Sequence, residues 1–130
     1  MNKNLLLTIV VALLAFSGIL FLVYITASNS NSKNNVFLPQ GIVLFYGQGC
    51  SHCKNVDDFI SQNKIEDKFK FTRLEVWYNK NNQNILAQAA QKCGIQTGQV
   101  GVPFLYDGGG KCYVGDVDTI NFFKQQAGIN

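Results

Sequence analysis

Two cysteines separated by two residues, Cys50 and Cys53, are the side chains of this sequence best suited to chemistry. They follow an apolar run, residues 42–46, and open a segment in which Cys53, Val56 and Ile60 recur at helical spacing. Unpaired N–H groups at a helix start stabilise a thiolate, so the pKa of Cys50 should lie below the value of about 8.5 of a free thiol. We therefore expect Cys50 to attack a partner disulfide, and the more buried Cys53 to resolve the mixed disulfide.

His52 lies between the two cysteines, and its imidazole can add positive charge near Cys50. That charge would stabilise the thiolate further and make the disulfide more oxidising. The dithiol is itself the redox group, so no metal or nucleotide cofactor is expected. Two other interpretations stay open. Cys50, His52 and Cys53 are soft donors that suit copper(I) in a metal-delivery protein, and the bridge could also be static in a non-catalytic interaction module.

Residues 36–130 are expected to form one α/β domain, in the order strand, helix, strand, helix, strand, strand, helix. A right-handed parallel unit followed by an antiparallel hairpin predicts a mixed four-stranded sheet flanked by helices. Asp116 or Asp118 can cap the last helix. The predicted strands cover residues 42–46, 68–78, 103–106 and 111–114.

Three motifs resemble the thioredoxin-like superfamily over about residues 40–126. They are Phe45-Tyr46-x-x-x-Cys50-Ser51-His52-Cys53, Gly101-Val102-Pro103-Phe104 and Val114-Gly115-Asp116. The Gly-Val-Pro motif and the glycine after the last strand are most similar to the glutaredoxin branch. The resemblance implies a thiol–disulfide oxidoreductase in which the Val102–Pro103 bond is cis and faces Cys50. Pro103 and Val102 would then contact the substrate, Val102 offering its backbone N–H and C=O to an extended segment.

The sequence also departs from the patterns of that superfamily. Ser51-His52 replaces the Gly-Pro of thioredoxins and the Pro-Tyr of many glutaredoxins, although a histidine in this place resembles the oxidising branch. Gly49 stands where thioredoxins carry an aromatic residue, and the first strand has no acidic residue. The direction of exchange, oxidation or reduction, is therefore left open.

Cys93 and Cys112 form a second candidate pair. Outside the cytoplasm spare thiols are more often paired, and closing a loop of about 20 residues would stabilise the fold by roughly 3 kcal/mol. We expect a structural disulfide, with two buried thiols or a second redox pair as the alternatives. The spacing of 19 residues does not suit a four-cysteine zinc site.

The N-terminal residues 5–26 contain no charged side chain. About 20 apolar residues are enough to cross roughly 30 Å of hydrocarbon, so we expect a transmembrane signal anchor, with a cleaved signal peptide as the alternative. Residues 1–4 would form a short cytoplasmic head and residues 27–35 a flexible linker. Positive-inside counting then places residues 27–130 outside the cytoplasmic membrane, with the domain in the periplasm or at the cell surface.

The small net charge of +3 argues against a protein that binds nucleic acid through phosphate contacts. The expected partners are protein thiols and disulfides, the membrane, and an integral membrane protein that resets the redox pair.

Overall fold

The structure is a computed structural model that describes residues 2–27, 37–96, 98 and 100–129, without the side chains of residues 5, 6 and 22–27. The chain divides into two compact units, Met1–Asn34 and Asn35–Asn130. The first unit contains helix α1 (Lys3–Ala27), and the second contains the remaining helices and all the strands.

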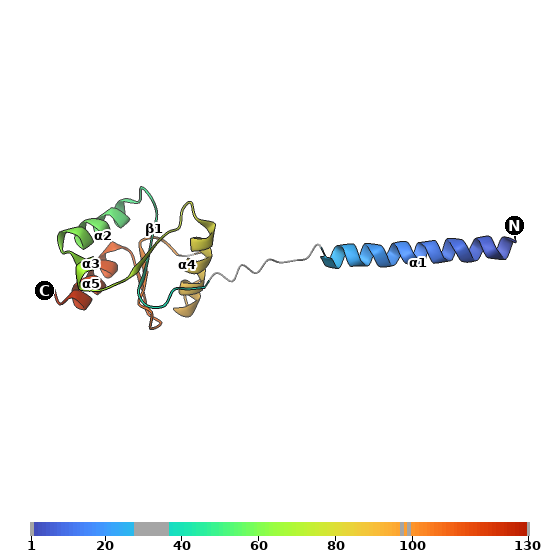
Figure 1. Ribbon diagram of the computed structural model, residues 1–130. Helices are drawn as coiled ribbons and strands as arrows, with labels where there is room; N and C mark the ends of the chain where they lie inside the picture. Colours follow the sequence, from blue (N-terminus) through green and yellow to red (C-terminus); the bar gives the residue numbers. More distant parts are fainter. Residues whose placement is uncertain (1, 28–36, 97, 99, 130) are drawn as a thin grey trace. The chain divides into compact units, whose positions relative to one another are not determined.

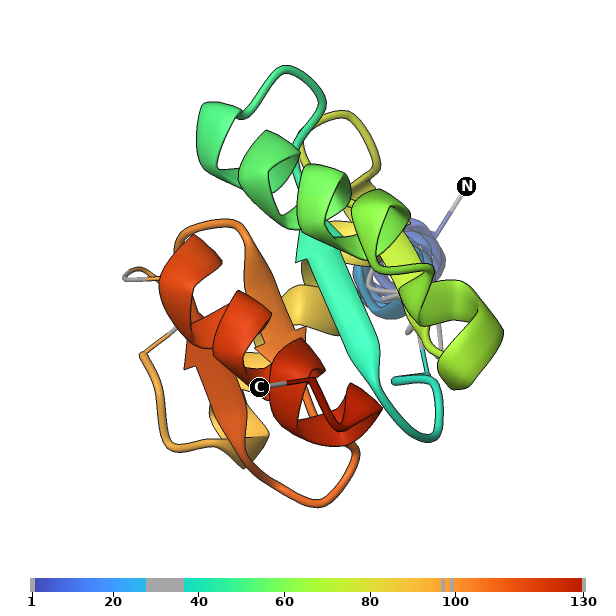
Figure 2. The ribbon, with the colours of Figure 1, turned by 90° about the vertical axis from the view of Figure 1, so that its left-hand side faces the viewer.

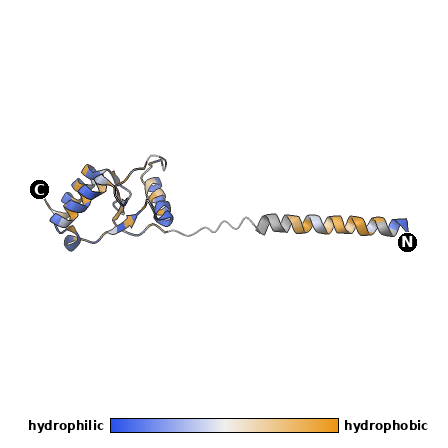
Figure 3. Cartoon of the chain, turned by 90° about the horizontal axis from the view of Figure 1, so that it is seen from above, coloured by the Kyte–Doolittle hydropathy of each residue, from blue (hydrophilic) through white to orange (hydrophobic). Residues whose placement is uncertain are grey.

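Helix α1 consists mostly of apolar residues between positions 7 and 21 (Figure 3). The side chains of these apolar residues are exposed. Among the residues described, no helix is long and apolar enough to cross a membrane. The span expected over 5–26 includes residues 5, 6 and 22–26, whose side chains lie outside that description. Of the expected linker, residues 27–35, the structure describes only Ala27. The membrane span and the linker therefore both stay predictions.

The second unit is built on a mixed four-stranded sheet in the order β2-β1-β3-β4, as the sequence predicts. Strand β1 (Val43–Tyr46) pairs in parallel with β2 (Thr72–Glu75) and antiparallel with β3 (Phe104–Tyr106). Strand β4 (Cys112–Val114) pairs antiparallel with β3 and completes the hairpin.

Helices cover both faces of this sheet (Figures 1 and 2). Helices α2 (Ser51–Gln62) and α5 (Asp116–Ala127) pack together on one face with the short α3 (Ile65–Lys68), and α4 (Lys80–Lys92) covers the other. The apolar run of β1 serves both faces. Its alternate residues join two separate cores, one with α4 and one with α2 and α5. That double burial explains why the run is continuous rather than alternating.

Two local expectations were wrong. The second strand is shorter than residues 68–78, because α3 takes up residues 65–68 and the chain leaves the sheet after Glu75. The cap of the last helix is neither Asp116 nor Asp118 but Gly115, at a φ of 87° and without a side-chain cap bond. Asp116 is already inside the first turn of that helix, and its carboxylate is bound by side chains of α2.

Candidate active site

Cys50 is the N-cap residue of α2 and forms a disulfide with Cys53. The backbone N–H of Cys53 donates to Cys50 Sγ over 3.2 Å, so the sulfur occupies the place of an ordinary N-cap acceptor. The position that the sequence predicts, at the mouth of a helix directly after a buried strand, is confirmed. A thiolate on Cys50 would receive the same N–H and the positive end of the helix dipole.

The two sulfurs differ in access. Cys53 is only 3% exposed and points into the core, whereas Cys50 is partly exposed. A cavity of about 360 Å³ opens beside them, lined mainly by residues 46–51 together with Cys53, Lys54 and Asp57. An incoming sulfur can therefore reach Cys50, while Cys53 lies behind it.

The Val102–Pro103 peptide is cis and lies beside Cys50, as the resemblance implies. The Val102 carbonyl oxygen is 3.7 Å from Cys50 Sγ, although the two residues are 52 positions apart. The antiparallel pairing of Phe45 with Phe104 produces this contact, because it brings the start of β3 to the end of β1. Val102 is partly exposed and Pro103 is buried.

His52 faces a carboxylate that the sequence analysis did not identify as its partner. Its Nδ1 lies 3.2 Å from Asp116 Oδ2, and the imidazole is 68% exposed. The amide of Asn55 donates to the same oxygen over 2.6 Å. The hydrogen bond from Asn55, followed by the one from His52, holds the pKa of Asp116 below its ordinary value. A protonated His52 would therefore have Asp116 as its ion-pair partner.

Glu75 joins the loop before Cys50 to the loop after β2. Its carboxylate accepts backbone hydrogen bonds from Trp77 over 2.8 Å, from Tyr78 over 3.0 Å and from Gln48 over 3.4 Å. Desolvation raises the pKa of Glu75, but the N–H groups of Tyr78, Trp77 and Gln48 together lower it below its ordinary value. The role of Glu75 could not be predicted from the sequence, because a single glutamate at a strand end carries no motif.

Cys93 and Cys112 also form a disulfide, with an S–S distance of 2.02 Å and a Cα–Cα distance of 5.9 Å. The bond joins the C-cap of α4 to the first residue of β4. Both cysteines pack against the core beneath α4. The structure thus has the expected bridge in place of two free thiols.

The described residues contain no group of three or more His, Cys, Asp or Glu side chains placed to hold a metal ion. Cys50, Cys53 and Val102 place a reachable sulfur, a shielded sulfur and a backbone acceptor next to one another, an arrangement compatible with disulfide exchange.

An α/β domain with a mixed four-stranded sheet and a disulfide of Cys-x-x-Cys spacing is compatible with a thioredoxin-like fold and with redox exchange. Comparisons of the chain with models of protein families, with curated proteins and with solved structures find no match.

Proposed function

We propose that this protein is a thiol–disulfide oxidoreductase that exchanges disulfides with protein substrates through Cys50 and Cys53. The observation that carries the proposal is the asymmetry of the pair at the start of α2. Cys50 is reachable and accepts the Cys53 N–H, whereas Cys53 is 3% exposed behind it. Such an arrangement favours attack at one defined sulfur.

In the oxidising direction a substrate thiolate attacks Cys50 Sγ, forms a mixed disulfide and expels Cys53 as a thiolate, which takes up a proton. A second substrate thiolate then attacks the substrate sulfur of that mixed disulfide and releases Cys50 as a thiolate. The substrate gains a disulfide and loses two electrons, which the Cys50–Cys53 pair accepts. The reducing direction is the reverse sequence, and a redox partner must restore the starting state in either case.

Val102 would bind the substrate chain during this exchange. Its carbonyl is 3.7 Å from Cys50 Sγ, so a substrate segment that reaches the sulfur also reaches this backbone acceptor. Pairing through the backbone accepts many sequences, which suits an enzyme that acts on protein cysteines. His52, 3.2 Å from Asp116, would adjust the charge close to the reacting sulfur.

The test is to trap the mixed disulfide with the Cys53→Ala variant. We expect protein substrates to accumulate on Cys50, because the resolving thiol is absent, and the adducts to be released by reductant. The Cys50→Ser variant, which keeps Cys53, is the matched control and should trap nothing. Equal trapping by both variants, or by neither, would contradict the proposal.

The reduction potential of the pair would then give the direction of exchange. A value near roughly −270 mV would indicate a reductant of the thioredoxin type, and one near roughly −120 mV a strong oxidant.

The same proposal includes a location outside the cytoplasmic membrane, with the N-terminal apolar segment as the anchor. The Cys93–Cys112 disulfide supports it, since such bonds persist in oxidising compartments. An integral membrane protein would be a suitable redox partner, because an anchor would hold the domain close to it.

A further inference from the structure

We propose that Trp77 and Tyr78, here called the aromatic rim, dock substrate segments that carry an apolar side chain next to the reacting cysteine. This inference rests on the proposed function and deepens it, because it names the class of substrate that the site prefers. The structure leaves Trp77 49% exposed and Tyr78 77% exposed.

The aromatic rim adjoins the redox site through Gly47. The Trp77 ring lies so close to this glycine that an added Cβ would be 2.3 Å from the indole. Gly47 lines the cavity that opens onto Cys50 and is three residues before it. The exposed indole of Trp77 therefore packs on a residue of the cavity wall, close in sequence to the reachable sulfur.

Glu75 holds the rim in that place. Its carboxylate binds the backbone N–H groups of both Trp77 and Tyr78, and also that of Gln48 in the loop before Cys50. A side chain of α4 adds a further link, as Gln83 Nε2 donates to the Val76 carbonyl over 2.7 Å. The backbone of the pair is fixed in this way and the Trp77 ring packs on Gly47, so docking on the indole costs little ordering of the site.

The charged side chains beside the cavity have partners of opposite sign. Lys54 Nζ lies 2.6 Å from Asp58 Oδ2, and Arg73 is paired with Asp57. Because these charged groups already have partners, we expect apolar contact with the aromatic rim to discriminate between substrates more strongly than charge does. A substrate with an apolar or aromatic residue beside its cysteine would bury more of the aromatic rim than a small polar disulfide does.

The experiment compares two peptide disulfides of equal charge, in which the cysteine is flanked by leucine or by serine, with bis(2-hydroxyethyl) disulfide as a small reference substrate. Second-order rate constants are measured for the full chain. We expect wild type to prefer the leucine peptide, and Trp77→Ala to lower that preference about tenfold, as the loss of a contact of the hot-spot kind does.

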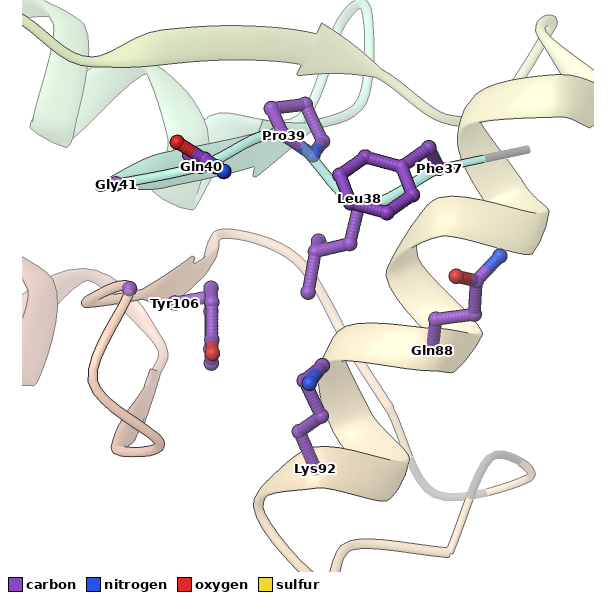
Figure 4. A pocket seen from close by; sticks show the side chains of 9 residues that line it. Phe37, Leu38, Pro39, Gln40, Gly41, Gln88, Lys92 and Tyr106 are labelled. Carbon is purple, nitrogen blue, oxygen red and sulfur yellow. The ribbon is translucent and has the colours of Figure 1, made fainter. Parts of the chain in front are cut away.

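A second variant keeps the indole and moves it. Gly47→Ala must displace the ring, because the new Cβ would overlap it, so the preference should fall there too. Phe37→Ala is the matched control, because Phe37 is also an exposed aromatic residue (76%). Phe37 precedes β1 in the sequence and lines a different cavity, of about 410 Å³ (Figure 4). The preference of this variant should equal that of wild type.

Trp77 is the only tryptophan of the chain and so reports docking directly. With a leucine peptide trapped on Cys53→Ala, its emission should shift to the blue, whereas a trapped serine peptide should leave it in place. Trapping without a shift, together with equal rates for the two peptides, would overturn the docking site and leave the exchange intact. Failure to trap either peptide would overturn the exchange itself.

Discussion

Asp116 shows how one carboxylate can connect two helices beside the Cys50–Cys53 disulfide. It accepts from Asn55 and contacts His52, both on α2, while it stands in the first turn of α5. Both interactions favour the ionised carboxylate, and its position near a helix N-terminus does the same. The residue therefore stabilises the packing of α2 against α5 and fixes the charge around His52.

The lowered pKa of Asp116 sets the sign of a pH effect. A depressed pKa in the folded state stabilises the fold above the ordinary value of 3.8, and this contribution disappears as the pH falls through the folded pKa. We expect Asp116→Asn to lower the free energy of unfolding near neutral pH. The difference from wild type should shrink towards zero in acid, as measured by urea denaturation across the pH range.

The matched control for this change is Asp118→Asn, which removes an exposed carboxylate from the same first turn. It separates the general effect of charge at a helix start from the specific contacts of Asp116. A difference between Asp116→Asn and wild type that stayed constant from neutral to strongly acidic pH would count against the assigned role of the ionised carboxylate.

Among the elements, the Cys93–Cys112 bond holds the edge strand β4 to the end of α4. The residues between the two cysteines include the segment that leads to Val102, strand β3 and the turn before β4. The bond thus constrains the segment that carries the proposed substrate acceptor, at a distance in sequence from the redox pair.

Replacing both Cys93 and Cys112 by alanine should lower the free energy of unfolding by about 3 kcal/mol, because a closed loop of roughly 20 residues is released in the unfolded chain. The variant should still form mixed disulfides on Cys50 when Cys53 is also changed to alanine. Loss of trapping in a variant that remains folded would contradict a purely structural role for the bond.

For the whole molecule, the proposal of membrane attachment in an oxidising compartment rests on an apolar N-terminal segment and a domain with two disulfides. The full chain should sediment with membranes, resist extraction by high salt and alkali, and be released by detergent. Protease added from the outer side should digest residues 36–130. A chain recovered in the soluble fraction with its N-terminus removed would indicate the cleaved signal instead.

Much of the fold could be predicted, because its signals are local. The five apolar residues before the Cys-x-x-Cys motif, the helical spacing of Val56 and Ile60, and the turn before Lys111 each reflect interactions between neighbours in sequence. The boundaries of β2 were less predictable. Phe69 and Phe71 look like strand residues, but they pack with Phe123 of α5 before the strand begins.

The Cys50–Cys53 pair, its order of burial and the proline beside it could be predicted from the sequence alone, since a motif of a few residues marks each one. The tertiary structure alone decided what surrounds them. Asp116 reaches His52 and Asn55 because α5 packs on α2, and Glu75 reaches Gln48 because β2 lies parallel to β1. The aromatic rim is exposed because the chain leaves the sheet at Glu75. Contacts such as these depend on strand register and helix packing. They join residues far apart in sequence, so no local spacing pattern predicts them.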